Sequence, residues 1–102
     1  MKIIIRPARI EDLARICTLE REIFGSDAYD EAYMQYLFWN TEVFLVATKP
    51  DGYIVGYIIC RIEGRKGHII NIGVHPNYQH RGIGSKLMVT LESNIRKLVD
   101  GK

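Results

Sequence analysis

The spacing of apolar residues predicts a strand, two helices, three strands and a final helix. The expected ranges are 3–6 for the first strand, about 11–24 and 31–39 for the two helices, 43–47, 53–61 and 68–74 for the three strands, and 82–98 for the last helix. The first helix has an apolar face interrupted once, at Glu20, and Gly25 is a natural end for it. The second helix is expected to carry Tyr33, Tyr36 and Leu37. The last helix has an apolar face at Ile83, Leu87, Met88, Leu91, Ile95 and Leu98, which we interpret as core.

Short turns join the three consecutive strands. Pro50-Asp51-Gly52 and Gly64-Arg65-Lys66-Gly67 combine residues that favour tight turns, and strands joined so closely pair antiparallel. Gly56 lies inside a strand, which indicates a bulge or a close approach of another element. The order β-α-α-β-β-β-α therefore predicts an α+β fold, in which helices flank a mainly antiparallel sheet.

Composition limits the class of protein. With 102 residues, of which 47% are apolar and 25% charged, the chain is expected to form a single globular domain spanning 1–102. A net charge of +2 gives little support for nucleic-acid binding, and no apolar run is long enough to cross a membrane, so we expect a cytoplasmic protein. Cys17 and Cys60 are expected to be buried thiols, and the histidines lack the spacing of metal ligands.

The segment Gln79-His80-Arg81-Gly82-Ile83-Gly84 follows a strand and opens a helix, as a phosphate-binding loop does. Glycines let a ligand approach the main chain, and a helix N-terminus offers free N–H groups and a positive dipole end. Gly84-Ser85-Lys86 has the wrong order for a nucleoside-triphosphate loop, and Leu87 stands where a dinucleotide loop needs a third small residue. A different phosphate-bearing cofactor is indicated.

The loop resembles that of the GCN5-related N-acetyltransferases, because Gln79-x-x-Gly82-x-Gly84 has the spacing of their acyl-CoA motif. Asn71 to Tyr78 is similar to the fourth strand of that family and the loop that leaves it, and Arg6-Pro7-Ala8 resembles its opening. The most similar subgroup is the ribosomal-protein-alanine and protein N-terminal acetyltransferases. The resemblance implies acetyl-CoA as cofactor and a family fold that lacks its C-terminal part, since full-length members continue beyond the third helix.

The resemblance also implies roles for particular residues. Main-chain groups of Ile72 and Val74 would pair with the pantetheine arm, and an amide near Ile72 or Gly73 would polarise the thioester carbonyl. We expect a bulge at Gly73 to aim that amide into the site, although Gly73 also suits simple packing. The pyrophosphate would be held by the loop and the first helical turn, which comprise Gln79, His80, Arg81, Gly82, Ile83, Gly84 and Ser85, with Arg81 adding charge.

The acceptor side is less well defined by the sequence. By the same resemblance, Phe24, Asp27 and Tyr29, with Tyr33 nearby, could form an amine pocket. Phe24 could instead belong to the core, and Asp27 could cap the second helix. The glutamate base and tyrosine acid of the alanine-acetylating subgroup fall beyond the last residue, so the catalytic residues stay unknown. Candidates for a substitute base are Glu22, Glu63 and His68, each of which also suits an ordinary surface position.

Two functions remain open at this stage. The first is acetyl transfer from acetyl-CoA to a primary amine, in particular a protein N-terminus, by an enzyme or its cofactor-binding portion. The alternative is a non-catalytic acyl-CoA-binding or interaction module. In either case the strand over 68–74 is expected to be an exposed sheet edge, and such an edge favours pairing into a homodimer.

Overall fold

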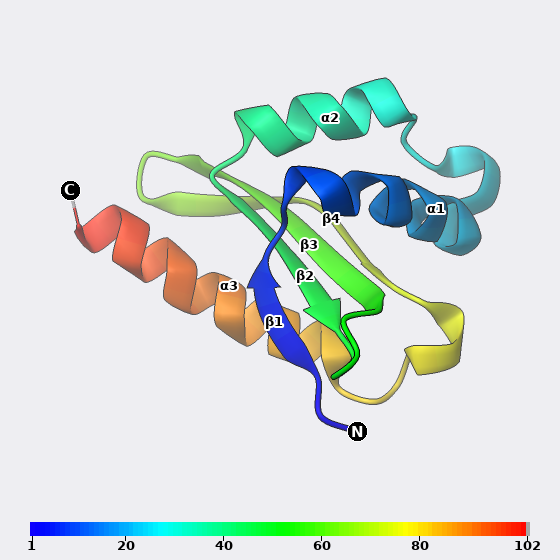
Figure 1. Cartoon of the computed structure of the whole chain (residues 1–102). Helices are drawn as coiled ribbons and strands as arrows, with labels where there is room; N and C mark the ends of the chain where they lie inside the picture. Colours follow the sequence, from blue (N-terminus) through cyan, green and yellow to red (C-terminus); the bar gives the residue numbers. More distant parts are fainter. Residues whose placement is uncertain (102) are drawn as a thin grey trace.

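The computed structural model describes residues 1–101, and its element order confirms the predicted β-α-α-β-β-β-α arrangement (Figure 1). Short 3-10 turns precede α1, follow it and precede α3. The strands and helices are β1 (Ile4–Pro7), α1 (Leu13–Phe24), α2 (Glu31–Asn40), β2 (Val43–Thr48), β3 (Ile54–Glu63), β4 (Lys66–Val74) and α3 (Ile83–Asp100).

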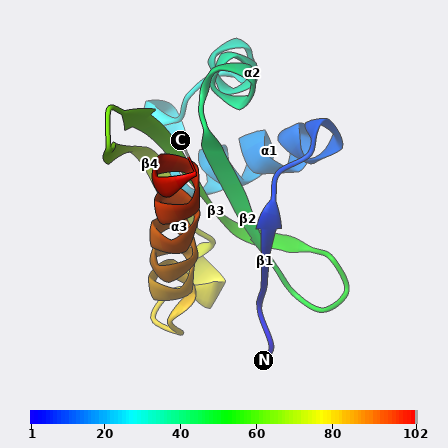
Figure 2. The ribbon, with the colours of Figure 1, turned by 90° about the vertical axis from the view of Figure 1, so that its left-hand side faces the viewer.

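The strands form one antiparallel sheet in the order β1-β2-β3-β4. Figure 2 shows α1 and α3 on opposite sides of this sheet. Both faces of the central strands are therefore covered, which explains why every residue of β2 is buried and why residues 43–47 are all apolar. β1 and β4 are the two edge strands.

Each face of the sheet has its own apolar cluster. On the face under α1 and α2, side chains of the sheet such as Val46, Tyr57 and Ile59 pack against Ile16 and Leu19 of α1. On the opposite face the sheet side chains pack against α3, and this cluster contains Val43, Leu45, Ala47, Val55, Ile58, Cys60, Ile83, Leu87 and Leu91. The alternation of side chains along β2 and β3 thus supplies both cores.

The structure shows which side of α2 is buried and corrects one residue of the face predicted for α3. In α2, Tyr33, Tyr36 and Trp39 are exposed, and the residues that contact the core are Met34 and Leu37. In α3, Leu98 is 40% exposed and the neighbouring Val99 is buried in its place, whereas Ile83, Leu87 and Leu91 are buried as predicted. In both helices the buried positions form a narrower stripe than the apolar content of the helix suggests.

Two strand glycines behave differently from each other. Gly56 allows the close approach that was predicted, since a Cβ there would lie 3.1 Å from the Gly73 carbonyl oxygen and 3.4 Å from Ile83 Cγ2. The pairing of β2 with β3 skips Val55, which is the predicted irregularity. Gly73, by contrast, is in register opposite Tyr57, and the bulge of β4 lies earlier, at Ile70. The prediction of a bulge at Gly73 is therefore wrong.

Packing explains the requirement for glycine at this position. A Cβ on Gly73 would lie 2.8 Å from the Tyr57 hydroxyl oxygen and 2.9 Å from Ile23 Cδ1. Because Gly73 has no side chain, the Tyr57 ring and hydroxyl can occupy the space beneath β4.

The remaining sequence predictions concern turns and special residues. Gly25, Gly52 and Gly64 all have positive φ, as expected for a helix end and two tight turns. The second turn is shorter than predicted, because Lys66 and Gly67 already pair within β4. Cys17 and Cys60 are both free and buried. Over residues 1–101, no helix combines the length and the apolar character needed to cross a membrane.

Candidate functional site

The C-terminal half of β4 presents main-chain groups to an open sheet edge. The His75 N–H donates to the Val55 carbonyl at 2.8 Å, and Gly73 lies opposite Tyr57 in the register. Because hydrogen-bonded residues alternate along an antiparallel pair, Gly73 directs its N–H and C=O toward β3, whereas Ile72 and Val74 direct theirs outward. The amide that faces this edge is therefore that of Ile72 and not that of Gly73.

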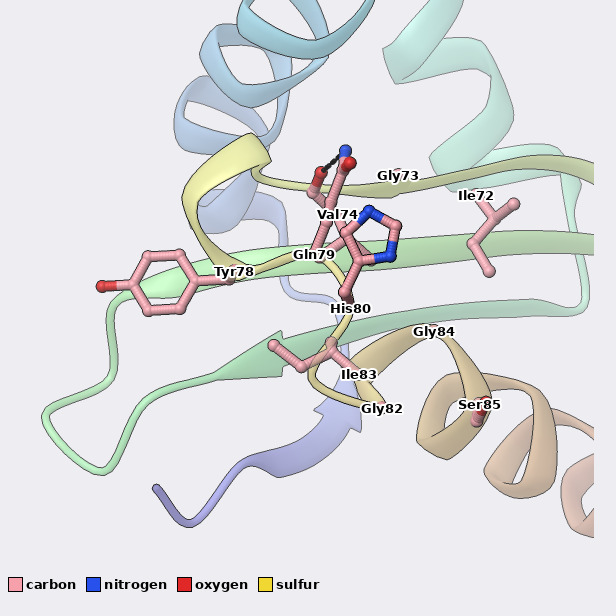
Figure 3. Close-up of a pocket in the computed structure, with 10 residues that line it drawn as sticks. All are labelled: Ile72, Gly73, Val74, Tyr78, Gln79, His80, Gly82, Ile83, Gly84 and Ser85. Atoms are coloured by element: carbon pink, nitrogen blue, oxygen red, sulfur yellow. Dashed lines mark hydrogen bonds between the residues drawn. The ribbon is translucent and has the colours of Figure 1, made fainter.

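Gln79 connects the end of this strand to the loop that follows it. Its side-chain Nε2 donates to the Val74 carbonyl at 2.9 Å, a bond drawn in Figure 3. This bond occupies one of the outward-facing acceptors of β4 and fixes the start of the loop. The outward N–H groups of Ile72 and Val74 and the carbonyl of Ile72 stay available to a ligand.

The loop before α3 has two residues in the left-handed region, His80 with φ +64° and Gly82 with φ +82°. Left-handed residues within a turn direct successive N–H groups toward a common point, which is a frequent anion-binding arrangement. Gly82 is also the N-cap of α3, and no side chain caps that helix. The first N–H groups of a helix of 18 residues are thus free to bind an anion.

These two features border one cavity of about 410 Å³, shown in Figure 3. Its lining comprises every residue that the sequence predicted for the cofactor site except Arg81, with Tyr78 in addition: Ile72, Gly73, Val74, Tyr78, Gln79, His80, Gly82, Ile83, Gly84 and Ser85. A Cβ on Gly84 would meet no atom within 4 Å, so the space beside the first turn of α3 is open. The outward-facing strand edge and the open helix N-terminus therefore adjoin one another.

Arg81 does not line the larger cavity. Its guanidinium carbon lies 5.4 Å from the centre of the Tyr78 ring, and the side chain lines a smaller adjoining cavity of about 100 Å³ with Met1 and Ile3. The positive end of the α3 dipole is a source of favourable field for an anion in the larger cavity.

The predicted acceptor residues lie in the connection between α1 and α2, apart from this cavity lining. Phe24 is half-buried at the end of α1 and belongs to neither apolar cluster, and Asp27 is exposed. Asp27 does not cap α2, because Asp30 accepts the capping bond from the Tyr33 N–H at 2.8 Å. Tyr29 packs against the core and contacts the edge of the Tyr33 ring, with 4.8 Å between ring centres.

None of the candidate bases lines the larger cavity in the described part of the chain. Glu22 accepts from Arg15 at 2.9 Å and pairs with His75 Nε2 at 3.1 Å. Glu63 and His68 are exposed on the β3–β4 hairpin. His75 is thereby identified as a residue that ties α1 to the loop after β4, since its Nδ1 also accepts from the Asn77 N–H at 3.0 Å.

A buried carboxylate lies on the other side of β4. Glu20 is 1% exposed and accepts hydrogen bonds from the Tyr57 hydroxyl, from Asn71 Nδ2 at 2.8 Å and from the Tyr29 N–H at 3.0 Å. Burial and then the hydrogen bond to Glu20 raise the pKa of Tyr57 far above its ordinary value. The sequence signal was the single carboxylate in an apolar helix face, and sequence reasoning assigned it no role.

A family model described as the acetyltransferase (GNAT) family matches residues 11–100 of the chain. Among individual proteins, the catalytic subunit ard1 of the N-terminal acetyltransferase A complex of Schizosaccharomyces pombe is 31% identical over 91 residues. That match covers 83% of this chain and 51% of the relative. The chain thus spans about half the length of this curated relative.

Solved structures of similar fold agree with this match. Ard1 of Thermoplasma volcanium superposes with a TM-score of 0.85 at 23% identity, covering 97% of this chain and 67% of that one. A GNAT family acetyltransferase of Brucella melitensis, solved in complex with acetyl-CoA, gives a TM-score of 0.79 at 24% identity and covers 95% and 70%. The strand edge, the loop with its glycines and the family match agree, and the chain belongs to the GNAT acetyltransferase family.

Proposed function

We propose that this chain binds acetyl-CoA and is an N-acetyltransferase, or the acetyl-CoA-binding portion of one, acting on a primary amine. The observation that carries the proposal is the continuity of the outward-facing edge at Ile72 and Val74 with the uncapped N-terminus of α3 in a single cavity. An extended amide chain and a pyrophosphate need these two features side by side. The Brucella melitensis structure with acetyl-CoA supports this ligand in a related fold.

In this proposal the residues of the chain bind and orient the cofactor. The outward main-chain groups of Ile72 and Val74 pair with the pantetheine amides as an added strand, and the N–H groups from Gln79 to Ser85 hold the pyrophosphate. The Ile72 N–H, which the strand alternation leaves free, is the donor for the thioester carbonyl oxygen. Acetyl-CoA supplies the activated acetyl group.

The acceptor that we propose is a protein N-terminal amine, in a cytoplasmic setting. The S. pombe relative, a catalytic subunit of an N-terminal acetyltransferase complex, supports this class of acceptor. Phe24, Asp27 and Tyr29 are proposed to lie on the acceptor side, where Asp27 offers an exposed carboxylate for an ammonium group. The general base and acid are unassigned, because Glu22 is engaged by Arg15 and His75, and Glu63 and His68 lie on the β3–β4 hairpin.

Isothermal titration calorimetry with acetyl-CoA tests cofactor binding directly. Gly84→Glu should abolish binding, because its carboxylate would occupy the open space at the first turn of α3 and repel the pyrophosphate. The fold should persist, since an acidic residue near a helix N-terminus is favourable by about 0.3–1 kcal/mol. A thiol-release assay with N-terminal peptides then tests transfer.

Two matched variants control for size and charge. Gly84→Ala should bind as the wild type does, because its methyl group meets no atom within 4 Å. Ser93→Glu places the same charge on an exposed position farther along α3 and should also bind normally. Absence of acetyl-CoA binding by the wild-type chain, or equal binding by Gly84→Glu, would refute the proposed site. Binding without thiol release would favour the non-catalytic module.

We also propose that the chain forms a homodimer through the N-terminal half of β4. This half precedes the bulge at Ile70 and is solvent-exposed, with Ile69 43% exposed at the sheet edge. Unpaired main-chain groups beside an exposed apolar side chain favour pairing with another strand. The half that borders the acetyl-CoA cavity, Ile72–Val74, would remain separate from this interface.

A further inference from the structure

Glu20 is a buried carboxylate in the core whose contacts reach both sides of the proposed site. It is 1% exposed, and its three hydrogen-bond partners come from three different segments. Oε1 accepts from the Tyr57 hydroxyl of β3 and from Asn71 Nδ2 of β4, and Oε2 accepts from the main-chain N–H of Tyr29. One side chain of α1 therefore joins two strands to the connection that leads into α2.

The strand partners of Glu20 adjoin the cavity lining. Asn71 immediately precedes Ile72, whose N–H faces the open edge. Tyr57 lies directly beneath Gly73, where its hydroxyl fills the room left by the absent Cβ. The strand partners of the carboxylate thus directly adjoin Ile72 and Gly73, the two residues at which the acetyl group is expected.

The third partner belongs to the acceptor side. Tyr29 directly follows the 3-10 turn Gly25–Asp27 and its C-cap Ala28, and it precedes Asp30, the N-cap of α2. The Tyr29 N–H donates to Oε2 of Glu20 in α1, and Asn71 of β4 donates to Oε1 of the same carboxylate, so Glu20 bridges this connection and β4. The connection is otherwise held by local turn bonds, such as that from the Ala28 N–H to the Gly25 carbonyl at 3.1 Å.

The contacts of Glu20 suit a residue that holds its neighbours in a fixed arrangement better than one that only fills the core. Burying a carboxylate carries a desolvation penalty that an apolar side chain would avoid. A gain in the stability of the fold therefore does not by itself explain a glutamate at this position. All three partners donate, which matches an ionised carboxylate because that group only accepts. Hydrogen bonds to a charged acceptor are short and directional, and they hold the three segments in one arrangement.

We propose that Glu20 is a positioning residue that locks the acceptor-side connection at Tyr29 to the acetyl-CoA strand at Asn71. The proposal rests on the proposed function, because it assigns the two joined segments to the acceptor and the cofactor. Ligand binding along Ile72–Val74 stabilises β4, and through Glu20 it also stabilises the Tyr29 segment. Acetyl-CoA thereby orders the acceptor side before the amine binds.

Glu20→Gln tests this positioning role, because glutamine has almost the same shape as glutamate. A glutamine has one accepting oxygen and a donating amide, so the donor at Tyr29 or the donors at Tyr57 and Asn71 would face an N–H group. We expect the Tyr29 amide to exchange its hydrogen about tenfold faster, as the loss of one buried hydrogen bond implies. Backbone exchange measured by NMR reports this without any ligand.

Two further variants separate positioning from general loss of stability. The double variant E20Q/N71D moves the carboxylate to position 71, where the side-chain amide introduced at position 20 can donate to it while the amide oxygen accepts from Tyr29. It should restore slow exchange at Tyr29. Leu91→Ala removes buried apolar volume on the opposite face of the sheet and should speed exchange throughout the core, with no selective effect at Tyr29.

Acetyl-CoA supplies the second readout. In the wild type, saturating acetyl-CoA should slow exchange at Tyr29 several-fold, and in Glu20→Gln this protection should disappear while the dissociation constant changes less than about twofold. Failure of the wild type to bind acetyl-CoA would refute the proposed function, yet the exchange at Tyr29 without ligand would still test the lock. Equal exchange at Tyr29 in the wild type and Glu20→Gln, or absence of rescue in E20Q/N71D, would overturn the inference.

Discussion

Arg6 and Asp12 form a two-pronged ion pair between β1 and the turn that begins α1. The Arg6 guanidinium donates to the two Asp12 oxygens at 2.8 and 3.0 Å, and the Arg9 N–H donates to Asp12 at 2.7 Å. The hydrogen bonds from Arg6 are the main reason why the pKa of Asp12 is lowered, with the Arg9 amide acting in the same direction. The pKa of Arg6 is raised for the reciprocal reason.

This ion pair makes stability depend on acidity. Because the pKa of Asp12 is lower in the folded than in the unfolded state, its contribution is complete above the unfolded value of about 3.9 and is lost as the pH falls through the folded value. Asp12→Asn should reduce the free energy of unfolding by about 1–3 kcal/mol at pH 7 and by much less at pH 2–3. Urea unfolding across this range measures it. Equal losses at pH 7 and pH 2.5 would contradict the argument.

At the scale of elements, the outer edge of β4 differs between its two halves. Its first half is exposed, whereas Ile72–Val74 borders the larger cavity, and the bulge at Ile70 separates the two. A bulge rotates the strand locally, so the two halves present their side chains and main-chain groups differently. The proposed dimer contact and the proposed acetyl-CoA site therefore use different halves of β4.

The proposed homodimer gives a prediction at this scale. Ile69→Lys places a charge on the exposed half of β4, where edge lysines commonly prevent strand pairing. Size-exclusion chromatography with light scattering should show a dimer for the wild type and a monomer for the variant, with acetyl-CoA binding retained. Val89→Lys, at a residue 68% exposed on α3, is the matched control and should remain dimeric. A wild type that is monomeric at high concentration would contradict the dimer.

At the scale of the whole molecule, β2 and β3 belong to both cores. Side chains of these strands pack alternately against α1 and α2 on one face and against α3 on the other. Lys86 of α3 also donates to the Ile3 carbonyl beside β1, which links the last helix to the first strand. Disrupting the apolar cluster on one face therefore also disturbs the strands that form the cluster on the other face. The two faces should unfold in one transition.

A pair of identical substitutions tests this coupling. Ile16→Val, in the cluster beneath α1, and Ile58→Val, in the cluster beneath α3, each delete one methylene group from a residue that is 0% exposed; Ile16 belongs to α1 itself and Ile58 to β3. Each should lower the free energy of unfolding by about 0.5–1.5 kcal/mol and leave a single transition. Val89→Ala, on the exposed side of α3, should change it by less than about 0.5 kcal/mol. Calorimetry that resolved two transitions in Ile58→Val would show that the layers are independent.

The element order and the loop from Gln79 to Gly84 between β4 and α3 could be predicted from sequence because their signals are local. Apolar spacing, Gly25, Gly52 and the run Gln79 to Gly84 depend on neighbours within a few residues, and the structure has the expected elements at each. Predictions that needed a distant partner were the ones that failed. The apolar face of α3 was expected to include Leu98, where Val99 is buried instead, and the bulge of β4 was expected at Gly73 and not at Ile70.

By itself, the sequence determined a helix N-terminus left open for an anion, a strand before it and a family with an acyl-CoA motif. Only the tertiary structure decided which β4 amides face outward, where Arg81 lies, and what surrounds Glu20. The reason is that register and burial arise from contacts between segments far apart in the chain, as with Glu20 and Asn71. A carboxylate within an apolar stripe is visible in the sequence, but its three donors meet it only when the sheet and helices have packed.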